Sequence, residues 1–223
     1  MLDIRVLIVG LLVVTVVCLI RAELRGNRRQ IRFFKPVATI LVISVVATAM
    51  LSGRQMSAGY SIFIMAGLLF SLGGDVALIF QEDSRAFRLG LVLFLAAHIM
   101  YIYSFINFSG ATKLPVGSTL ILALLGAIVY AVLYPHLGRL KVPVFIYVLV
   151  ISYMVNRAIA SHFSPVFSVQ QAWQISIGAV LFYFSDLMLA LNRFGYPFRY
   201  HRISLVFYYG GQLGIALSTF GPT

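Results

Sequence analysis

Charge and cysteine are what this sequence has least of. Only 10% of its 223 residues are charged, whereas 61% are hydrophobic, and its mean hydropathy is +0.98. Soluble globular domains carry about 25% charged residues, so that class is excluded. The single cysteine, Cys18, excludes an internal disulfide and a multi-cysteine metal site, and no HExxH motif is present. We therefore expect neither a metal nor a cofactor.

Apolar runs of about 20 residues recur along the chain, and each is long enough to cross ~30 Å of hydrocarbon as a helix. The sequence therefore predicts an all-α membrane protein that forms one domain over residues 1–223. The expected eight transmembrane helices cover residues 4–20, 36–52, 60–80, 86–107, 114–134, 142–161, 170–191 and 201–220. Pro36, Pro115 and Pro143 are expected at helix starts, where a missing N–H does no harm.

The basic residues are distributed unevenly between the two sides of this arrangement. Thirteen lysines and arginines fall in the four odd-numbered connections, whereas only Arg5, Arg54 and Lys113 fall on the opposite side. By the positive-inside rule, the odd-numbered connections face the cytoplasm and both termini face away from it. We expect the protein in the inner (plasma) membrane of a bacterium. The net charge of +11 forms no basic stripe with interleaved aromatics, so nucleic acid is excluded as a partner.

Two aspartates, Asp75 and Asp186, are the only acidic residues of six that lie within expected spans. A carboxylate at mid-membrane costs at least ~2.5 kcal/mol on insertion scales, which favours a functional role. The alternative is a structural carboxylate that pairs with a cation or joins helices. Each aspartate stands five residues before the expected end of a helix that runs toward the cytoplasm. Both are therefore expected at one depth, about 7–8 Å inside the cytoplasmic boundary.

Polar residues recur at equal distances after the two aspartates. His98 and Tyr209 follow them by 23 residues, and Tyr101 and Gln212 follow by 26. This pattern suggests the hypothesis of a weak four-plus-four parallel repeat, with its axis along the membrane normal. Such an axis would bring the third and seventh helices face to face.

Several motifs occur in a characteristic order along the chain. They are "KPV" at 35–37, "SLGGDVAL" at 71–78, "GLVLFLAAHIMY" at 90–101, "YVLVISYM" at 147–154, "GAVLFYFSDLMLALNRF" at 178–194 and "YYGGQL" at 208–213. In this ordered set the chain resembles the YhhN family of lysoplasmalogenase-like membrane proteins along nearly its full length.

The resemblance implies an eight-helix enzyme that cleaves the vinyl ether bond of lysoplasmalogens. The products would be a fatty aldehyde and glycerophosphoethanolamine or glycerophosphocholine, and the partner a lysophospholipid within membrane lipid. The family's two acidic positions map onto Asp75 and Asp186 as catalytic residues. The positions that the resemblance marks as supporting or substrate-binding are Lys35, His98, Tyr101, Tyr147, Ser185, Asn192, Tyr208, Tyr209 and Gln212.

Two neighbouring carboxyl groups suit this chemistry. A vinyl ether hydrolyses when its β-carbon is protonated, which gives an oxocarbenium ion that water traps as a hemiacetal. The reaction needs one carboxyl that keeps its proton near neutral pH and one carboxylate, and two acids close together in a low-dielectric site supply both. Glycoside hydrolysis uses a similar pair. Which aspartate is the acid stays open at this stage.

Three other functions compete with this interpretation. A proton-coupled transporter could use Asp75 and Asp186 as its relay, and a structural membrane protein could use them to join helices. Transporters favour spans broken by glycine or proline; the third and seventh spans lack proline, although Gly73 and Gly74 precede Asp75. An intramembrane aspartyl protease is disfavoured, because Leu72 replaces the first glycine of its G-x-G-D motif.

Overall fold

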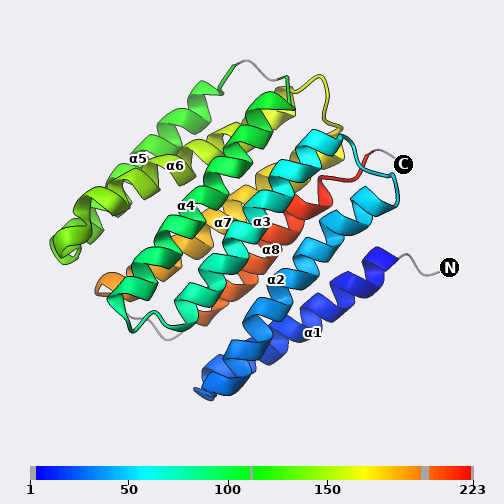
Figure 1. Cartoon of the computed structure of the whole chain (residues 1–223). Helices are drawn as coiled ribbons and strands as arrows, with labels where there is room; N and C mark the ends of the chain where they lie inside the picture. The colour runs from blue at the N-terminus through cyan, green and yellow to red at the C-terminus, as the bar shows by residue number, and fades with distance from the viewer. Residues whose placement is uncertain (1–3, 111–112, 197–200, 222–223) are drawn as a thin grey trace. The chain divides into compact units, whose positions relative to one another are not determined.

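The computed structural model describes residues 4–110, 113–196 and 201–221, which are almost entirely helical. The eight α-helices in these ranges are α1 (Ile4–Leu24), α2 (Arg28–Leu51), α3 (Ala58–Ile79), α4 (Ser84–Asn107), α5 (Val116–Leu133), α6 (Lys141–Ala160), α7 (Val169–Phe194) and α8 (Ser204–Leu217) (Figure 1). Short 3₁₀ turns lie at Tyr134–His136, Gly138–Leu140, Ser161–Phe163 and His201–Ile203. The prediction of an all-α protein with eight helices is confirmed.

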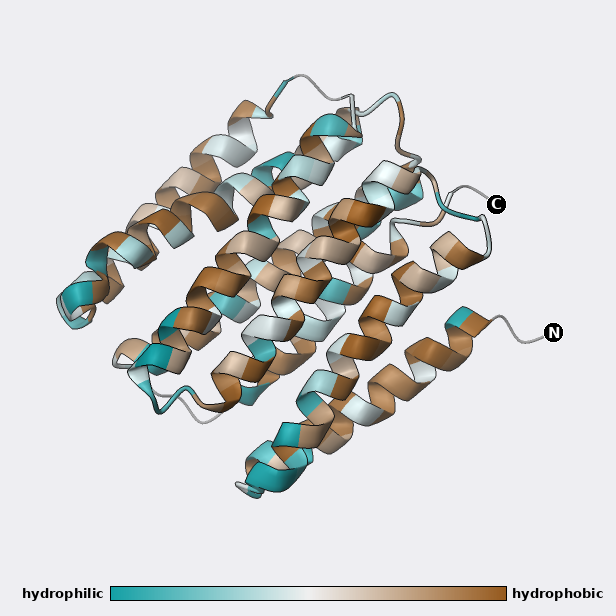
Figure 2. Cartoon of the chain, viewed as in Figure 1, coloured by the Kyte–Doolittle hydropathy of each residue, from teal (hydrophilic) through white to brown (hydrophobic). Residues whose placement is uncertain are grey.

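Seven of these helices, α1 to α7, are long and apolar enough to cross a membrane. Figure 2 shows hydrophobic residues along these helices and a hydrophilic group at the turn between α1 and α2. The eighth helix, α8, has 14 residues and is about 21 Å long at 1.5 Å per residue. The chain is therefore an integral membrane protein with seven candidate spans and one shorter helix in the described ranges.

The start of α2 differs from the prediction. This helix begins at Arg28, two turns before Pro36, so the placement of Pro36 at a helix start is wrong. The side chain of Asn27 caps the new start, because its oxygen accepts a hydrogen bond from the Gln30 N–H at 3.2 Å. Pro36 costs the helix one backbone hydrogen bond, which membrane helices tolerate. Pro115 and Pro143 do lie at helix starts, at the N-cap of α5 and in the first turn of α6.

The two aspartates stand at different distances from the ends of their helices. The end of α7 is Phe194, three residues beyond the predicted end, and Gly195 terminates it with a φ of 136°. Asp75 consequently lies four residues before the end of α3, and Asp186 eight residues before the end of α7. The predicted equal spacing of five residues is wrong, and the helix segments beyond the aspartates measure about 6 Å and 12 Å.

The chain divides into two compact units. The first comprises residues 1–101 and 215–223, and the second comprises residues 102–214. In the first unit α1 packs on α2 and α2 packs on α3; in the second, α5 packs on α6 and α6 packs on α7. The aspartates fall in different units, and a single domain over the whole chain stays a prediction.

Residues near the C-terminus return to the connection between α2 and α3. The Met56 N–H donates to the Thr219 carbonyl at 2.9 Å, and the Gly221 N–H donates to the Arg54 carbonyl at 2.7 Å. The Tyr60 and Ser218 hydroxyls are hydrogen-bonded at 2.7 Å. We call this set of contacts, made by residues 218–221, the C-terminal clasp.

The start of α1 meets the same clasp. The guanidinium of Arg5 lies over the ring of Phe220, 4.7 Å from the ring centroid. Both described ends of the chain therefore lie at one end of the first unit.

Candidate functional site

The first part of the site is presented by α2. Its buried residues recur every three or four positions, at Ala38, Thr39, Val42, Val45, Val46 and Ala49. This spacing forms one helix face, which packs on α1 and α3. Lys35 stands one turn before Thr39, so the two side chains lie on the same side of α2.

Asp75 of α3 receives both of these side chains. The Thr39 hydroxyl donates a hydrogen bond to Oδ2 of Asp75 at 2.5 Å, and Nζ of Lys35 lies 3.5 Å from Oδ1. The carboxyl group is 1% exposed. A buried carboxylate is stabilised only if it is paired and hydrogen-bonded, and α2 supplies both kinds of partner.

Tyr101 of α4 packs against Gly67 of α3, two turns before Asp75. A Cβ atom on Gly67 would lie 2.3 Å from Cε1 of Tyr101, so the ring occupies the space that a side chain would need. His98, fully buried, precedes Tyr101 by three residues on the same face of α4. In the first unit, Lys35 thus pairs with Asp75, and Tyr101 packs on Gly67, two turns before that aspartate.

Asp186 has a comparable partner in the second unit. The Tyr147 hydroxyl of α6 donates a hydrogen bond to Oδ2 of Asp186 at 2.5 Å. Ser185 is buried beside it on α7. Asn192 lies six residues beyond Asp186, which places it on a different side of α7. The structure therefore brings Tyr147 to Asp186 and does not bring Asn192 to this pair.

The polar residues of α8 pack near the same face of α7. The ring of Tyr208 packs edge-to-face on Phe182, with centroids 5.3 Å apart, and Phe182 stands one turn before Asp186. The side-chain amide of Gln212 donates to the Tyr208 hydroxyl at 2.9 Å. Tyr209 is buried next to Tyr208, with ring centroids 4.8 Å apart. The predicted tyrosine and glutamine group is thus one cluster.

Glycine sets the distance between α7 and α8. A Cβ atom on Gly211 would lie 2.7 Å from the Gly178 carbonyl oxygen and 2.8 Å from the Phe182 nitrogen. The two backbones are therefore in direct contact, as is typical of small residues between membrane helices. This contact fixes where Tyr208 and Gln212 of α8 lie against α7.

Thr39 is the residue that sequence reasoning missed. Its only sequence signal is its position four residues after Lys35, on the same helix face. Within the described ranges, His, Cys, Asp and Glu side chains form no group of three or more that could hold a metal ion. That Asp75 and Asp186 lie close together stays a prediction, because they belong to separate units.

The structure thus defines a class: an all-helical integral membrane protein with two aspartates on apolar helices, each hydrogen-bonded by a neighbouring helix. The YhhN family model matches residues 30–219, and the chain belongs to the YhhN family. The first helix, α1, precedes the matched residues.

Curated relatives that the chain matches carry the name lysoplasmalogenase. The chain is 36% identical over 162 residues to lysoplasmalogenase TMEM86A of Bos taurus. The matched residues cover 70% of this chain and 64% of that protein. It is 33% identical over 184 residues to lysoplasmalogenase TMEM86B of Sus scrofa, covering 82% of this chain and 73% of the relative. A lysoplasmalogenase of Mycobacterium tuberculosis is 27% identical over 178 residues, covering 78% of this chain and 63% of the relative. The chain thus matches a little under two thirds of the bovine protein. No solved structure matches it.

Proposed function

We propose that this protein is a membrane hydrolase that cleaves the vinyl ether bond of lysoplasmalogens. The products are a fatty aldehyde and glycerophosphoethanolamine or glycerophosphocholine. The observation that carries the proposal is the pair of aspartates, each held by a hydroxyl donor from the preceding helix: Thr39 for Asp75, and Tyr147 for Asp186. Relatives named lysoplasmalogenase support the choice of substrate.

The proposed reaction needs two carboxyl groups and one water. The protonated carboxyl transfers its proton to the β-carbon of the vinyl ether, and an oxocarbenium ion forms at the α-carbon. The carboxylate takes a proton from water as the water oxygen bonds to that carbon, which gives a hemiacetal. The hemiacetal then collapses to the aldehyde and the free glycerol hydroxyl. Two carboxyl groups about 5–9 Å apart suit this sequence, and we propose this separation for Asp75 and Asp186.

The contacts within each unit support the proposed four-plus-four repeat. Asp75 lies on α3 and receives a hydroxyl from α2; Asp186 lies on α7 and receives a hydroxyl from α6. The donor thus comes from the preceding helix in both units, and the two arrangements are four helices apart.

The clasp supports an even number of crossings. Arg5 and Phe220 are in contact, so the chain begins and ends on one side of the first unit. Seven crossings would place the two ends on opposite sides of the membrane, and we therefore propose that α8 completes an eighth. From the positive-inside rule we further propose that both termini lie outside the cytoplasm. The membrane that we propose is the inner membrane of a bacterium.

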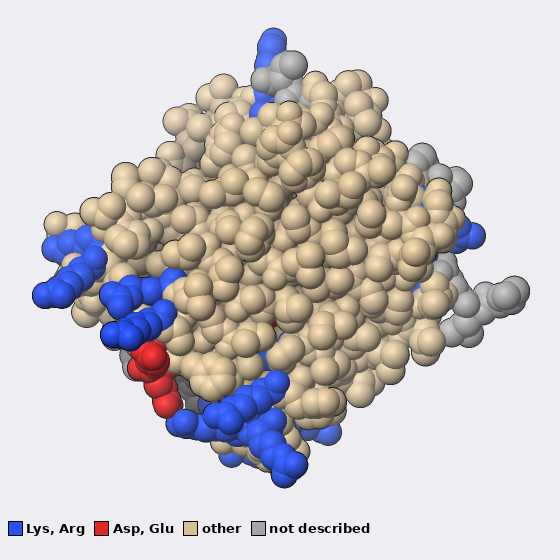
Figure 3. Space-filling model, in the orientation of Figure 1, with Lys and Arg blue, Asp and Glu red and all other residues tan. Residues whose placement is uncertain are grey.

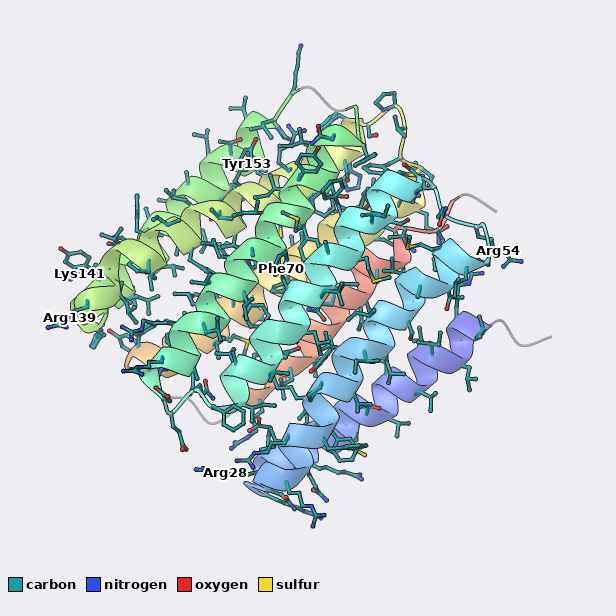
Figure 4. All side chains as sticks on the ribbon, viewed as in Figure 1. Arg28, Arg54, Phe70, Arg139, Lys141 and Tyr153 are labelled. Atoms are coloured by element: carbon teal, nitrogen blue, oxygen red, sulfur yellow. The ribbon has the colours of Figure 1, made fainter. Side chains whose placement is uncertain are left out.

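Basic side chains mark the proposed cytoplasmic end. Figure 3 shows Lys and Arg in clusters near the edges of the visible face, with an acidic group beside two of them and mostly uncharged residues over the centre. Figure 4 labels Arg28 and Arg54 near opposite ends of α2, and Arg28 forms an ion pair with Glu82 at 2.7 Å. Lys35 lies two turns inside from Arg28. We propose that the lipid phosphate binds near Lys35 and this basic end, with the acyl chain between helices.

The decisive experiment uses detergent-purified protein. Incubation with a lysoplasmalogen should release a fatty aldehyde, whereas the matched alkyl-ether lysolipid should stay intact because it has no double bond to protonate. Asp75→Asn and Asp186→Asn should each lower turnover by at least about 100-fold, since an amide fills the same space but cannot exchange a proton. Both variants should elute from a sizing column as wild type does.

The same experiment tests the transporter alternative. Both α3 and α7 continue through their aspartates without interruption, unlike the broken spans expected of a transporter. If the protein is a transporter, no aldehyde appears, reconstituted vesicles take up the lipid intact, and the aspartate variants alter only that uptake.

A further inference from the structure

We infer that Asp75 is the ionised carboxylate of the catalytic pair, that Thr39 is its positioning residue, and that Asp186 is the proton donor. This inference rests on the proposed vinyl ether hydrolysis and assigns the two roles within it. It follows from the groups that contact the two oxygens of Asp75.

Both oxygens of Asp75 face hydrogen-bond donors from α2. Oδ1 lies 3.5 Å from Nζ of Lys35, an ammonium that can donate but cannot accept a hydrogen bond. Oδ2 accepts from the Thr39 hydroxyl at 2.5 Å. A protonated carboxyl would need an acceptor at one of these positions, whereas a carboxylate is satisfied by donors at both.

The Thr39 hydroxyl has a single proton, and geometry decides where it goes. Its second neighbour is the Lys35 carbonyl oxygen, at 3.4 Å, near the limit for a hydrogen bond. The 2.5 Å contact to Asp75 is much the shorter, so the proton points at the carboxylate. Thr39 is fully buried, and its branched side chain is stiff at χ1, so it holds Asp75 in one orientation.

Helix α4 also packs on α3, where the ring of Tyr101 fills the space beside Gly67, two turns before Asp75. The charged partner that α2 brings to Asp75 is the Lys35 ammonium, whose Nζ lies 3.5 Å from Oδ1. An opposite charge at this distance favours the ionised carboxylate.

These roles complete the cycle without a net change in either residue. Asp186 gives its proton to the β-carbon, and Asp75 takes a proton from the attacking water. As the hemiacetal collapses, Asp75 returns that proton to the leaving glycerol oxygen, and the ionised Asp186 takes the hemiacetal hydroxyl proton. One water is consumed, and both residues regain their starting states.

The test compares two substitutions at Thr39. Thr39→Ser keeps the hydroxyl, whereas Thr39→Val keeps the shape and removes it. A bell-shaped profile of kcat/KM against pH is expected, whose acidic limb reports the residue that must be ionised. Loss of a hydrogen bond to a charged group is worth a shift of about one to two pH units. Thr39→Val should therefore move the acidic limb to higher pH by that amount, and Thr39→Ser should restore it.

The opposite results overturn the assignment. A shift of the basic limb in Thr39→Val would make Asp75 the acid. If neither limb moves, Thr39 does not act on the catalytic carboxylate. Thr48→Val is the matched control on α2, because the Thr48 hydroxyl donates to the Ser44 carbonyl of its own helix at 2.7 Å. It should move neither limb.

A second measurement needs no turnover. Infrared difference spectra between wild type and Asp75→Asn at neutral pH should show a carboxylate band for Asp75 and no protonated carboxyl band. A protonated band would contradict the inference even if aldehyde release is confirmed. If aldehyde release fails but the carboxylate band is present, the proposed function falls while the ionised state of Asp75 stands.

Discussion

His98 is fully buried on α4, on the helix face that also carries Tyr101. Replacement of His98 by Gln keeps a hydrogen-bonding group and removes a titratable one. If His98 orients an aspartate or a water, the pH profile of His98→Gln should keep its bell shape at a lower maximum, and kcat/KM measured across pH checks this. A lost acidic or basic limb would contradict it and would make His98 a proton-transfer group.

The residues around Asp75 differ in how visible they are in the sequence. An aspartate in an apolar run is conspicuous, because charge within a membrane is costly. Thr39 is not conspicuous, since a threonine hydroxyl within a helix usually bonds the carbonyl four residues back, as that of Thr15 does. The sequence therefore revealed Asp75 and, through family resemblance, Lys35. Only the tertiary contact between α2 and α3 distinguishes Thr39 from other threonines.

At the scale of helices, α7 and α8 contact each other closely at Gly211, whereas the adjacent Gly210 has more space around it. A methyl group on Gly211 would lie 2.7 Å from the Gly178 carbonyl oxygen, whereas one on Gly210 would meet only Leu181, at 3.5 Å. Gly211→Ala should destabilise the protein by about 1–3 kcal/mol, because neither backbone can move aside. Gly210→Ala is the matched control and should melt close to wild type. Thermal midpoints in detergent measure the difference, and equal midpoints would refute the backbone contact.

Helix number was predictable because each long apolar run needs a helix to cross the membrane. The residues at which the helices begin and end were less predictable. The segment before Pro36 is basic, and hydropathy alone predicts a loop there, yet Asn27 caps it and α2 begins at Arg28. Likewise, α7 continues past its apolar run to Phe194. Beyond the hydrocarbon, caps and local contacts decide where a helix ends, and hydropathy carries little information about them.

For the whole molecule, the number of crossings is the testable property. Reporters fused to the N-terminus and, separately, to the C-terminus should both be active on the non-cytoplasmic side, because Arg5 and Phe220 meet at one end of the first unit. A reporter fused after Arg85, in the first turn of α4, should be cytoplasmic and serves as the control. A cytoplasmic C-terminus with an external N-terminus would show that α8 does not cross. Both termini in the cytoplasm would refute the orientation and leave eight crossings intact.

The contacts of the C-terminal clasp can form only late in translation. The hydrogen bond between Tyr60 and Ser218 joins residues that are 158 positions apart. At about 5–20 residues per second, the ribosome adds Ser218 roughly 8 to 30 seconds after Tyr60. All seven candidate spans have been translated before the clasp residues leave the ribosome. A chain that terminates before residue 215 would therefore insert its long helices and still lack the contacts that close its first unit, which makes it a natural substrate for membrane quality control.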